Sequence, residues 1–390
     1  MPIPYPAPIT PNELGLTVAT RLSRIPPGPP LDPVTTSLGR QVIDSFKTPL
    51  PKRIDSSFAW VGKGPDGLES RRERWTRYVT DEDVEELERA AAEFIESGKN
   101  LGELTQEDFK IPNFAKTLTT IANKVNNELG VFLLRGLPVK KWSREQSAVV
   151  LLGIGSYVGD RVPQNKKGHV LGHVKDLRVD PKAPSTRRYM TNARQGFHTD
   201  HCDAVALMCL ETAPGGGESL VASSTTVYNI LQERYPELVP VLFAPWYWDR
   251  KNEDLPGQTP YFVAPPYTWH AGRLLSFCIP YFATTTERHD GVPPLTPEQV
   301  EVLKRLEEIA EEVAVEMSLE AGDIQFVNNH PIFHDRLAWR DTPDQIRHLL
   351  RLWLSTGGRG GWDLPSDGQN VRLGFVGAEP SVPLEAEIGQ

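Results

Sequence analysis

The segment QGFHTDHCDA, residues 195–204, places two of the nine histidines of this 390-residue chain three positions apart, around an aspartate. Successive side chains of a β-strand point to opposite faces, so in a strand over 197–203 His198 and Asp200 lie on the same face. An imidazole and a carboxylate side by side can bind one metal ion. Because so short a pair also arises by chance as a simple hydrogen-bonded pair, the metal hypothesis requires further ligands.

The segment PIFHDR, residues 331–336, offers a third ligand, His334, in an apolar stretch that is typical of a strand. His330 precedes it by four, but HPIFH lacks the glutamate of a zinc-protease helix and Pro331 disfavours helix. Two histidines and one carboxylate leave three positions of an octahedral ion open, as in non-haem Fe(II) oxygenases. Zinc with open positions uses the same ligand types, so these residues alone leave the metal undecided.

The downstream segment RHLLRLWLS places Arg347 and Arg351 four apart in an apolar run, on one face of an expected strand. Guanidinium groups that face the interior need anionic partners, because a buried unpaired charge is costly. Two such arginines beside a metal indicate two anionic groups in the site.

The ordered combination of HTD, GGGES, NNHPIFHDR and RHLLRLWL resembles the TauD/TfdA (clavaminate synthase-like) family of Fe(II)- and 2-oxoglutarate-dependent dioxygenases, over roughly residues 77–355. The resemblance implies a mostly-β fold with flanking helices, built on a distorted double-stranded β-helix, or jelly roll. It implies that the enzyme uses Fe(II), 2-oxoglutarate and dioxygen to oxidise a C–H bond. By motif, the iron ligands are His198, Asp200 and His334, and the far carboxylate of 2-oxoglutarate is held by Ser219 and Arg347.

The same resemblance gives expectations for the substrate. Arg351 matches the position that binds the anionic head of the substrate in sulfonate-cleaving members, although the roles of Arg347 and Arg351 exchange if Arg347 lies too far from the iron. Further substrate candidates are Arg194, shortly before the HTD motif, and Gln164 and Asn165, in a polar loop that resembles the substrate-side loop of the family. We expect a small organic anion, such as an amino acid, carboxylate or sulfonate, that is hydroxylated, desaturated or cyclised.

Two other readings of the motifs remain open at this point. One is a cupin-type metalloenzyme that uses iron or zinc without 2-oxoglutarate. The other is a non-catalytic jelly-roll module that binds an anion, or a protein partner through a proline-rich arm. Intact HTD and HDR motifs argue against the second reading, because a decayed enzyme is expected to lose its metal ligands early.

The chain divides into an arm and one domain. Residues 1–51 contain twelve of the 35 prolines and no sustained period, which indicates an extended proline-rich arm. Residues 52–390 are expected to form a single dioxygenase domain. Within it, residues 246–267 are rich in aromatics and prolines without a clear period, and we expect a lid over the pocket.

Two helices have strong amino-terminal signals. Thr80 can cap a helix that starts with three acidic residues, and Thr-Pro-Glu-Gln at residues 296–299 forms a capping box with proline at the first helical position. The acidic residues of the second helix, Glu307 among them, are expected to form its solvated side.

Composition narrows the class of partner. A net charge of −9 and a pI near 5.6 argue against nucleic acid or an anionic membrane as the main partner. The amino terminus has no signal-peptide pattern, no run of 18 apolar residues occurs, and three cysteines without CxxC spacing suit a reducing compartment. We therefore expect a cytoplasmic enzyme that acts on a small molecule, and the sequence leaves a homo-oligomer open.

Overall fold

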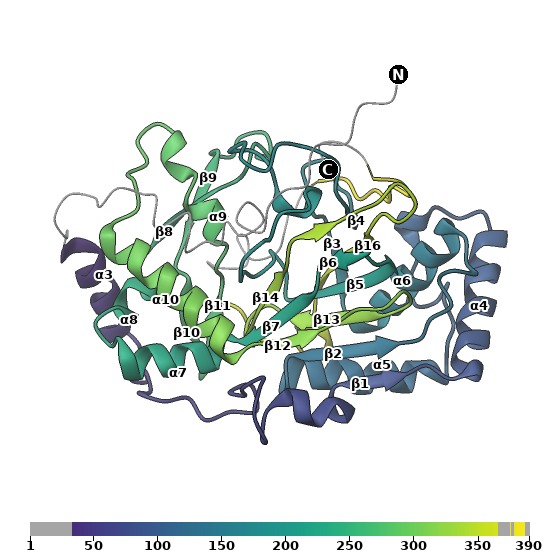
Figure 1. Ribbon diagram of the computed structural model, residues 1–390, viewed down its shortest axis with the longest axis horizontal. Coiled ribbons are helices and arrows are strands. Elements are labelled where there is room, and N and C mark those ends of the chain that lie inside the picture. Colours follow the sequence, from purple (N-terminus) through teal and green to yellow (C-terminus); the bar gives the residue numbers. More distant parts are fainter. Residues whose placement is uncertain (1–32, 366–374, 376–377, 387–390) are drawn as a thin grey trace.

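The computed structural model describes residues 33–365, 375 and 378–386, so most of the predicted arm lies outside the described residues (Figure 1). Residues 33–44 of the arm form helix α3 (Pro33–Asp44), which packs through Val42 and Ile43 against the apolar cluster that contains α8 (Val239–Phe243). The prediction of an extended arm is therefore wrong for residues 33–44. Among the described residues, no helix has the length and apolar character needed to cross a bilayer.

The larger of two central sheets has seven strands. In spatial order they are β1 (Thr76–Tyr78), β2 (Val131–Arg135), β13 (Ile324–Asn328), β5 (Ala204–Glu211), β16 (His348–Ser355) and β3 (Asp160–Val162), with β4 (Leu171–Val174) also paired to β16. All pairs are antiparallel except β1 with β2. The sheet thus brings together strands from both ends of the domain.

The smaller sheet places β7 (Ser219–Ser223) between β12 (Val315–Met317) and β14 (Ile332–Arg336). All its pairs are antiparallel, and the register sets His334 opposite Val221 and Arg336 opposite Ser219. Cross-strand partners point to the same side of a sheet, so these four side chains share one face. The strands that we predicted around His334 and Arg351 are both present.

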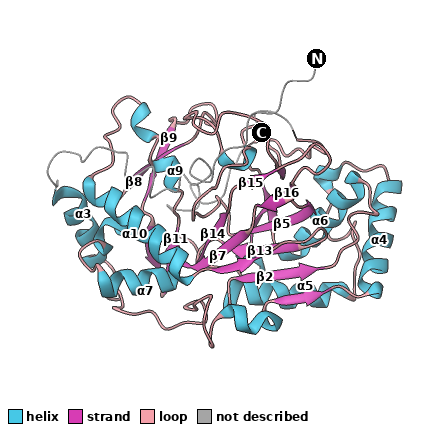
Figure 2. Cartoon of the chain, viewed as in Figure 1, coloured by secondary structure: helices cyan, strands magenta, loops and turns pink. Residues whose placement is uncertain are grey.

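Helices cover the outer faces of the two sheets (Figure 2). The larger sheet is covered by α4 (Asp81–Glu96), α5 (Phe114–Asn123), which continues into a π-helix (Lys124–Glu128), and α6 (Arg144–Val158). The smaller sheet is flanked by α7 (Ser224–Arg234), α8 and α10 (Pro297–Val313). Both expected caps form, since the hydroxyls of Thr80 and Thr296 accept backbone N–H bonds within capping boxes.

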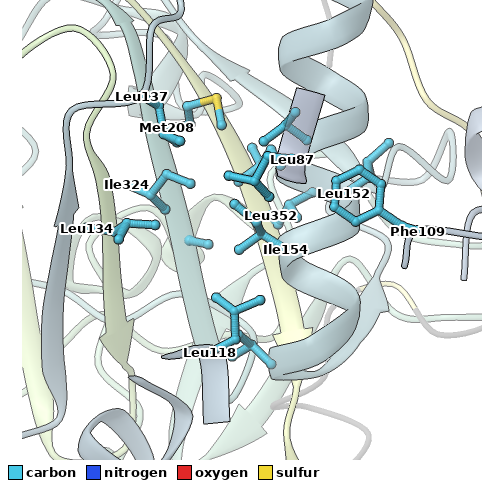
Figure 3. Packing of buried hydrophobic residues seen from close by; sticks show 14 of the residues in the cluster. Leu87, Phe109, Leu118, Leu134, Leu137, Leu152, Ile154, Met208, Ile324 and Leu352 are labelled. Atoms are coloured by element: carbon cyan, nitrogen blue, oxygen red, sulfur yellow. The ribbon is translucent and has the colours of Figure 1, made fainter. Parts of the chain in front are cut away.

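Strand alternation separates the two faces of the larger sheet. The even-numbered residues of its central strands, such as Met208, Ile324 and Leu352, face outward and pack against Leu87 of α4 and Leu152 of α6 (Figure 3). The odd-numbered residues face the smaller sheet, where Trp353 and Val327 lie in one cluster with Val221 and Ile332. Polar residues on these inward faces are therefore directed into the space between the sheets.

The segment around residues 246–267 is more regular than its sequence suggested. It forms a hairpin of β8 (Trp246–Asp249) and β9 (Tyr261–Ala264), followed by a second hairpin of β10 (Tyr267–His270) and β11 (Arg273–Ser276). The buried Asp249 carboxylate anchors the first hairpin by accepting bonds from Arg288 at 2.8 Å and from the backbone N–H of Lys251 at 2.8 Å. The prediction of an irregular loop is wrong, while its role as a lid remains a prediction.

Short elements complete the chain. They are the two-residue strands β6 (Gly215–Gly216) and β15 (Trp339–Arg340), which pair with each other, helix α9 (Pro280–Ala283), and the 3₁₀ turns Leu68–Arg74, Leu101–Glu103, Arg188–Met190, Thr286–Arg288 and Gly357–Arg359.

Candidate active site

Three predicted metal ligands converge between the sheets. His198, Asp200 and His334 are buried, and one potential ligand atom from each lies within 4.8 Å of the others. Nε2 of His198 is 4.0 Å from one oxygen of Asp200, and Nε2 of His334 is 3.9 Å from the other. Since ligands of this kind bind a metal at about 2.0–2.2 Å, two donors on one ion are at most about 4.4 Å apart. Both Nε2–oxygen distances lie within this limit, so each imidazole can share one cation with Asp200.

The backbone joins the two histidine segments directly. The N–H of His198 donates to the carbonyl of His334 at 3.0 Å, and the N–H of His334 donates back to the carbonyl of His198 at 2.9 Å. This pair is an isolated bridge, and β5 begins only at residue 204. The predicted strand over 197–203 is therefore wrong, because the chain bends between the bridge and β5. His198 and Asp200 still reach one point, since the bridge fixes His198 and Asn329 accepts the backbone N–H of Asp200 at 2.8 Å.

The two imidazoles are neutral at physiological pH. Burial lowers the pKa of His198, and burial together with the adjacent His198 lowers the pKa of His334 to about 3. Nδ1 of His198 pairs with the carbonyl oxygen of Gly196 at 2.9 Å, so that nitrogen carries the proton and Nε2 keeps its lone pair toward Asp200. A neutral histidine with its outer nitrogen fixed is the form that binds a metal ion.

The carboxylate is held ionised. Burial alone would raise the pKa of Asp200, but the nearby charge of Arg351, together with the hydrogen bond from Trp353, favours the ionised form, and the pKa is lowered. The indole Nε1–H of Trp353 donates to Asp200 Oδ2 at 2.9 Å, and Nη1 of Arg351 lies 3.4 Å from the same oxygen. Both residues come from the inward face of β16, and for Arg351 the alternation of RHLLRLWLS predicted this interior position.

Aromatic rings and an amide fix the orientation of Arg351. Its guanidinium lies 4.7 Å from the ring of Tyr189 and 4.9 Å from the ring of Trp353. Its Nε donates to Oε1 of Gln164 at 2.7 Å, while Nε2 of Gln164 donates to the backbone carbonyl of Arg351 at 2.8 Å. All polar groups of Gln164 are thus used within the protein, with the third bond going to the carbonyl of Val170. Gln164 is reassigned from substrate binding to positioning Arg351.

A cavity beside the three candidate metal ligands is lined by a second set of polar side chains. Ser219, Gln325, Arg336, Arg347 and Arg351 line it together with the three candidate ligands. The hydroxyl of Ser219 donates to Oε1 of Gln325 at 3.0 Å, and Nη2 of Arg347 donates to the carbonyl of Gly217 at 3.2 Å. Burial lowers the pKa of Arg347 to about 10. A wider surface cleft, lined in part by Gln106 and Arg161, contains none of the predicted site residues.

Sequence reasoning missed several residues of this cavity, among them the polar side chains of Arg336 and Gln325. Arg336 follows His334 by two positions on β14, so strand alternation alone places both side chains on the same face. Gln325 lies on the inward face of β13, in a segment that the sequence showed only as a short apolar run. The HDR motif therefore already indicated that Arg336 lies on the same face as His334. The position of Gln325 could not be predicted without knowing which strands pair with β13.

Arg194 has a different role from the one predicted. Its guanidinium forms ion pairs with Asp335 at 2.7 Å, Glu311 at 2.7 Å and Glu307 at 3.1 Å, and it does not line the cavity. The same carboxylates hold the chain before the HTD motif, because Asp335 accepts the N–H of Gly196 at 2.8 Å. Arg194 is therefore reassigned from substrate binding to this ion-pair network.

Two further expectations are corrected by their contacts. Glu307 is buried rather than on the solvated side of α10, and burial together with Asp335 raises its pKa to about 8.

Asn165 accepts the backbone N–H groups of Lys167 at 3.0 Å and His169 at 3.2 Å through Oδ1. That arrangement is an Asx-type turn that shapes the loop, and Asn165 does not line the cavity.

A buried two-histidine, one-carboxylate cluster between antiparallel sheets, with cationic side chains on its open side, defines a mononuclear non-haem metal oxygenase. Residues 97–353 match the family described as "Taurine catabolism dioxygenase TauD, TfdA family". The chain belongs to this family. It is an oxidoreductase, a non-haem iron dioxygenase that uses Fe(II), 2-oxoglutarate and dioxygen.

Individual relatives agree with this assignment. The chain is 32% identical over 319 residues to the taurine hydroxylase-like protein SAT17 of Stachybotrys chartarum, covering 79% of this chain and 81% of that one. It is 31% identical over 320 residues to FR-33289 synthase of Streptomyces rubellomurinus, covering 78% and 91%. A solved asparagine oxygenase shares the fold, with a TM-score of 0.57 at 19% identity over 73% of this chain and 94% of that one. The expected jelly-roll core with flanking helices is confirmed.

Proposed function

We propose that this enzyme oxidises a C–H bond of a small organic anion, by hydroxylation, desaturation or ring closure. In this proposal His198, Asp200 and His334 hold the iron. When bound, the iron together with 2-oxoglutarate and dioxygen supplies the oxidising power, and 2-oxoglutarate leaves as succinate and carbon dioxide. The tasks of the chain are to orient these ligands, to exclude water and to place one C–H bond at the metal.

We assign the far carboxylate of 2-oxoglutarate to Ser219 and Arg347. Both residues line the cavity that contains the metal cluster, and Nη1 of Arg347 is buried without a partner among the described residues. A guanidinium is the group of choice for a carboxylate, because its parallel N–H bonds match the two oxygens. The serine hydroxyl can donate a further bond once it turns from Gln325.

The observation that carries the substrate assignment is the position of Arg351. Its guanidinium faces the cavity next to Asp200, on the metal side, whereas Arg347 lies at the end with Ser219 and Gly217. With the distal end assigned to 2-oxoglutarate, Arg351 is the cation available for an anionic group close to the metal. A relative is named taurine hydroxylase-like, and taurine carries a sulfonate, which agrees with this assignment.

The surroundings of Arg351 suit an anion-binding role. Tyr189 and Trp353 cover the faces of the guanidinium, and Gln164 directs its Nε edge. An arginine held in this way loses little side-chain entropy when an anion binds. Its burial also removes water that would weaken the ion pair.

The test is a screen under air after anaerobic loading with Fe(II). Amino acids, carboxylates and sulfonates are each paired with their neutral amide analogues, and substrate-dependent succinate is measured. We expect succinate with anionic members only, and a product that has gained one oxygen or lost two hydrogens by mass spectrometry. In Arg351→Met the KM for that substrate should rise at least tenfold, with a much smaller change in the KM for 2-oxoglutarate. Equal turnover of the neutral analogues would refute the proposal.

A further inference from the structure

Two guanidinium groups share one indole at the distal end of the cavity. Arg336 lies 4.1 Å from the ring of Trp339, and Arg347 lies 4.8 Å from it. Both arginines are at least 95% buried, and both line the cavity. The register of the smaller sheet sets Arg336 directly opposite Ser219, so the two side chains point to the same side.

The chain fixes the indole in place. Nε1–H of Trp339 donates to Oδ1 of Asp341 at 3.0 Å, and the backbone N–H of Arg347 donates to the same oxygen at 2.8 Å. Gly217 has a φ of +80°, and a Cβ there would lie 2.8 Å from Nε of Arg347. The glycine is therefore required for the close approach of the arginine to the backbone. The platform and both cations are held by specific contacts.

The two arginines have unused hydrogen-bond donors. Nε and Nη1 of Arg336 and Nη1 of Arg347 are buried and have no partner among the described residues, while Nη2 of Arg336 donates to the carbonyl of Ala193. A buried donor without an acceptor is costly, and for a charged group the cost is larger. Two neighbouring cations with free donors therefore indicate an anion that is bound between them.

We propose that Arg336 binds the far carboxylate of 2-oxoglutarate together with Arg347 and Ser219. This inference rests on the proposed function, to which it adds a second guanidinium at the cosubstrate site. A carboxylate has two oxygens with about four acceptor positions, so it can satisfy both guanidinium groups and the hydroxyl at once. Arg336 is thereby a cosubstrate-binding residue rather than part of the ion-pair network around Arg194.

The experiment compares two keto acids in the absence of oxygen. Wild-type enzyme and Arg336→Met are loaded with Fe(II) and titrated with 2-oxoglutarate or with 2-oxobutyrate, which keeps the keto-acid end and lacks the distal carboxylate. Binding is measured by calorimetry and by the visible charge-transfer band. We expect Arg336→Met to bind 2-oxoglutarate about tenfold to a hundredfold more weakly, as for loss of a charged hydrogen-bond partner, with 2-oxobutyrate unchanged.

Matched variants separate this role from a structural one. Arg340→Met removes an exposed arginine from the same short strand as Trp339 and should bind both keto acids as the wild type does. Arg336→Lys keeps the charge without the paired N–H groups, and it should recover part of the affinity. It also serves as the informative variant if Arg336→Met does not fold.

Three other outcomes would overturn the inference, and one of them would also refute the proposed function. Wild-type affinity for 2-oxoglutarate in Arg336→Met and Arg336→Lys would overturn the inference while leaving the proposed function intact. An equal loss for both keto acids would also overturn it, since the distal carboxylate would then not be the group that is recognised. A wild-type protein that binds Fe(II) but neither keto acid would refute the proposed function and this inference together.

Discussion

Replacement of Arg194 by methionine should destabilise the enzyme in a pH-dependent way. The arginine pairs with two buried carboxylates, Glu307 and Asp335, and with the more exposed Glu311, and its own side chain is 11% exposed. Methionine keeps much of the aliphatic volume but removes the charge. Breaking a buried ion pair from one side costs about 3–5 kcal/mol, because the remaining charges stay buried without compensation.

The direction of the pH dependence follows from Glu307. Its pKa is raised to about 8 from an ordinary value of 4.5. Because the folded-state value is the higher one, the stabilisation from this group is complete below pH 4.5 and is lost as the pH rises through about 8. At about 1.4 kcal/mol per pH unit, that window corresponds to roughly 5 kcal/mol. Without Arg194 the pKa of Glu307 rises further, so the variant should lose more stability at pH 9, where most of Glu307 is ionised in the wild type, than at pH 5.5.

Urea unfolding at the two pH values measures this effect. We expect Arg194→Met to lower the free energy of unfolding by about 3–5 kcal/mol at pH 9, and by at least about 1 kcal/mol less at pH 5.5. Arg234→Met is the control, since Arg234 of α7 pairs at 2.7 Å with Glu312 of α10, the helix that carries Glu307, but both side chains are about half exposed. It should cost under about 1 kcal/mol at either pH. The prediction would be contradicted if Arg194→Met lowered the free energy of unfolding by under about 1 kcal/mol, or by the same amount at both pH values.

Three further substitutions test two hydrogen bonds beside the site and one helix cap on α10. Gln164→Leu removes the acceptor for Nε of Arg351. The KM for substrate should therefore rise about tenfold, with little change in the KM for 2-oxoglutarate. Parallel changes in both constants would argue against a positioning role for Gln164. Trp353→Phe removes the donor to Asp200, and anaerobic titration should show Fe(II) binding weakened by about tenfold, whereas unchanged affinity would show that this bond does not orient the carboxylate. Thr296→Ala removes a helix cap and should lower the free energy of unfolding by about 1 kcal/mol, and Thr296→Ser, which keeps the hydroxyl, should recover most of the loss.

Local sequence patterns predicted the elements that position the site. The capping signals at Thr80 and Thr296 marked two helix starts, since an N-cap depends on only a few neighbouring residues. Likewise, strand alternation in RHLLRLWLS placed Arg347 and Arg351 on one face, and both side chains line the cavity. These predictions succeeded because the information lies within one turn of helix or within one strand.

The predictions that failed depended on contacts between distant segments. Glu307 looked solvated because its helix is acidic, and only the chain before the HTD motif makes that position buried. Arg194 looked like a substrate residue because it lies near the HTD motif, but Asp335 is 141 positions away along the chain. Residues 246–264 form a hairpin whose anchor includes Arg288, which lies outside the segment. No pattern within a single segment reveals such partners.

The reciprocal main-chain bonds between His198 and His334 mean that the polypeptide, rather than an incoming ion, fixes the spacing of two coordinating rings. We therefore expect the apoprotein to fold completely without iron. Chelation should strip the metal without melting the protein, and fresh Fe(II) should restore the same centre. We expect such a preformed site to bind other divalent ions that prefer nitrogen donors as well, so the supply of metals during biosynthesis should influence which ion the purified enzyme contains.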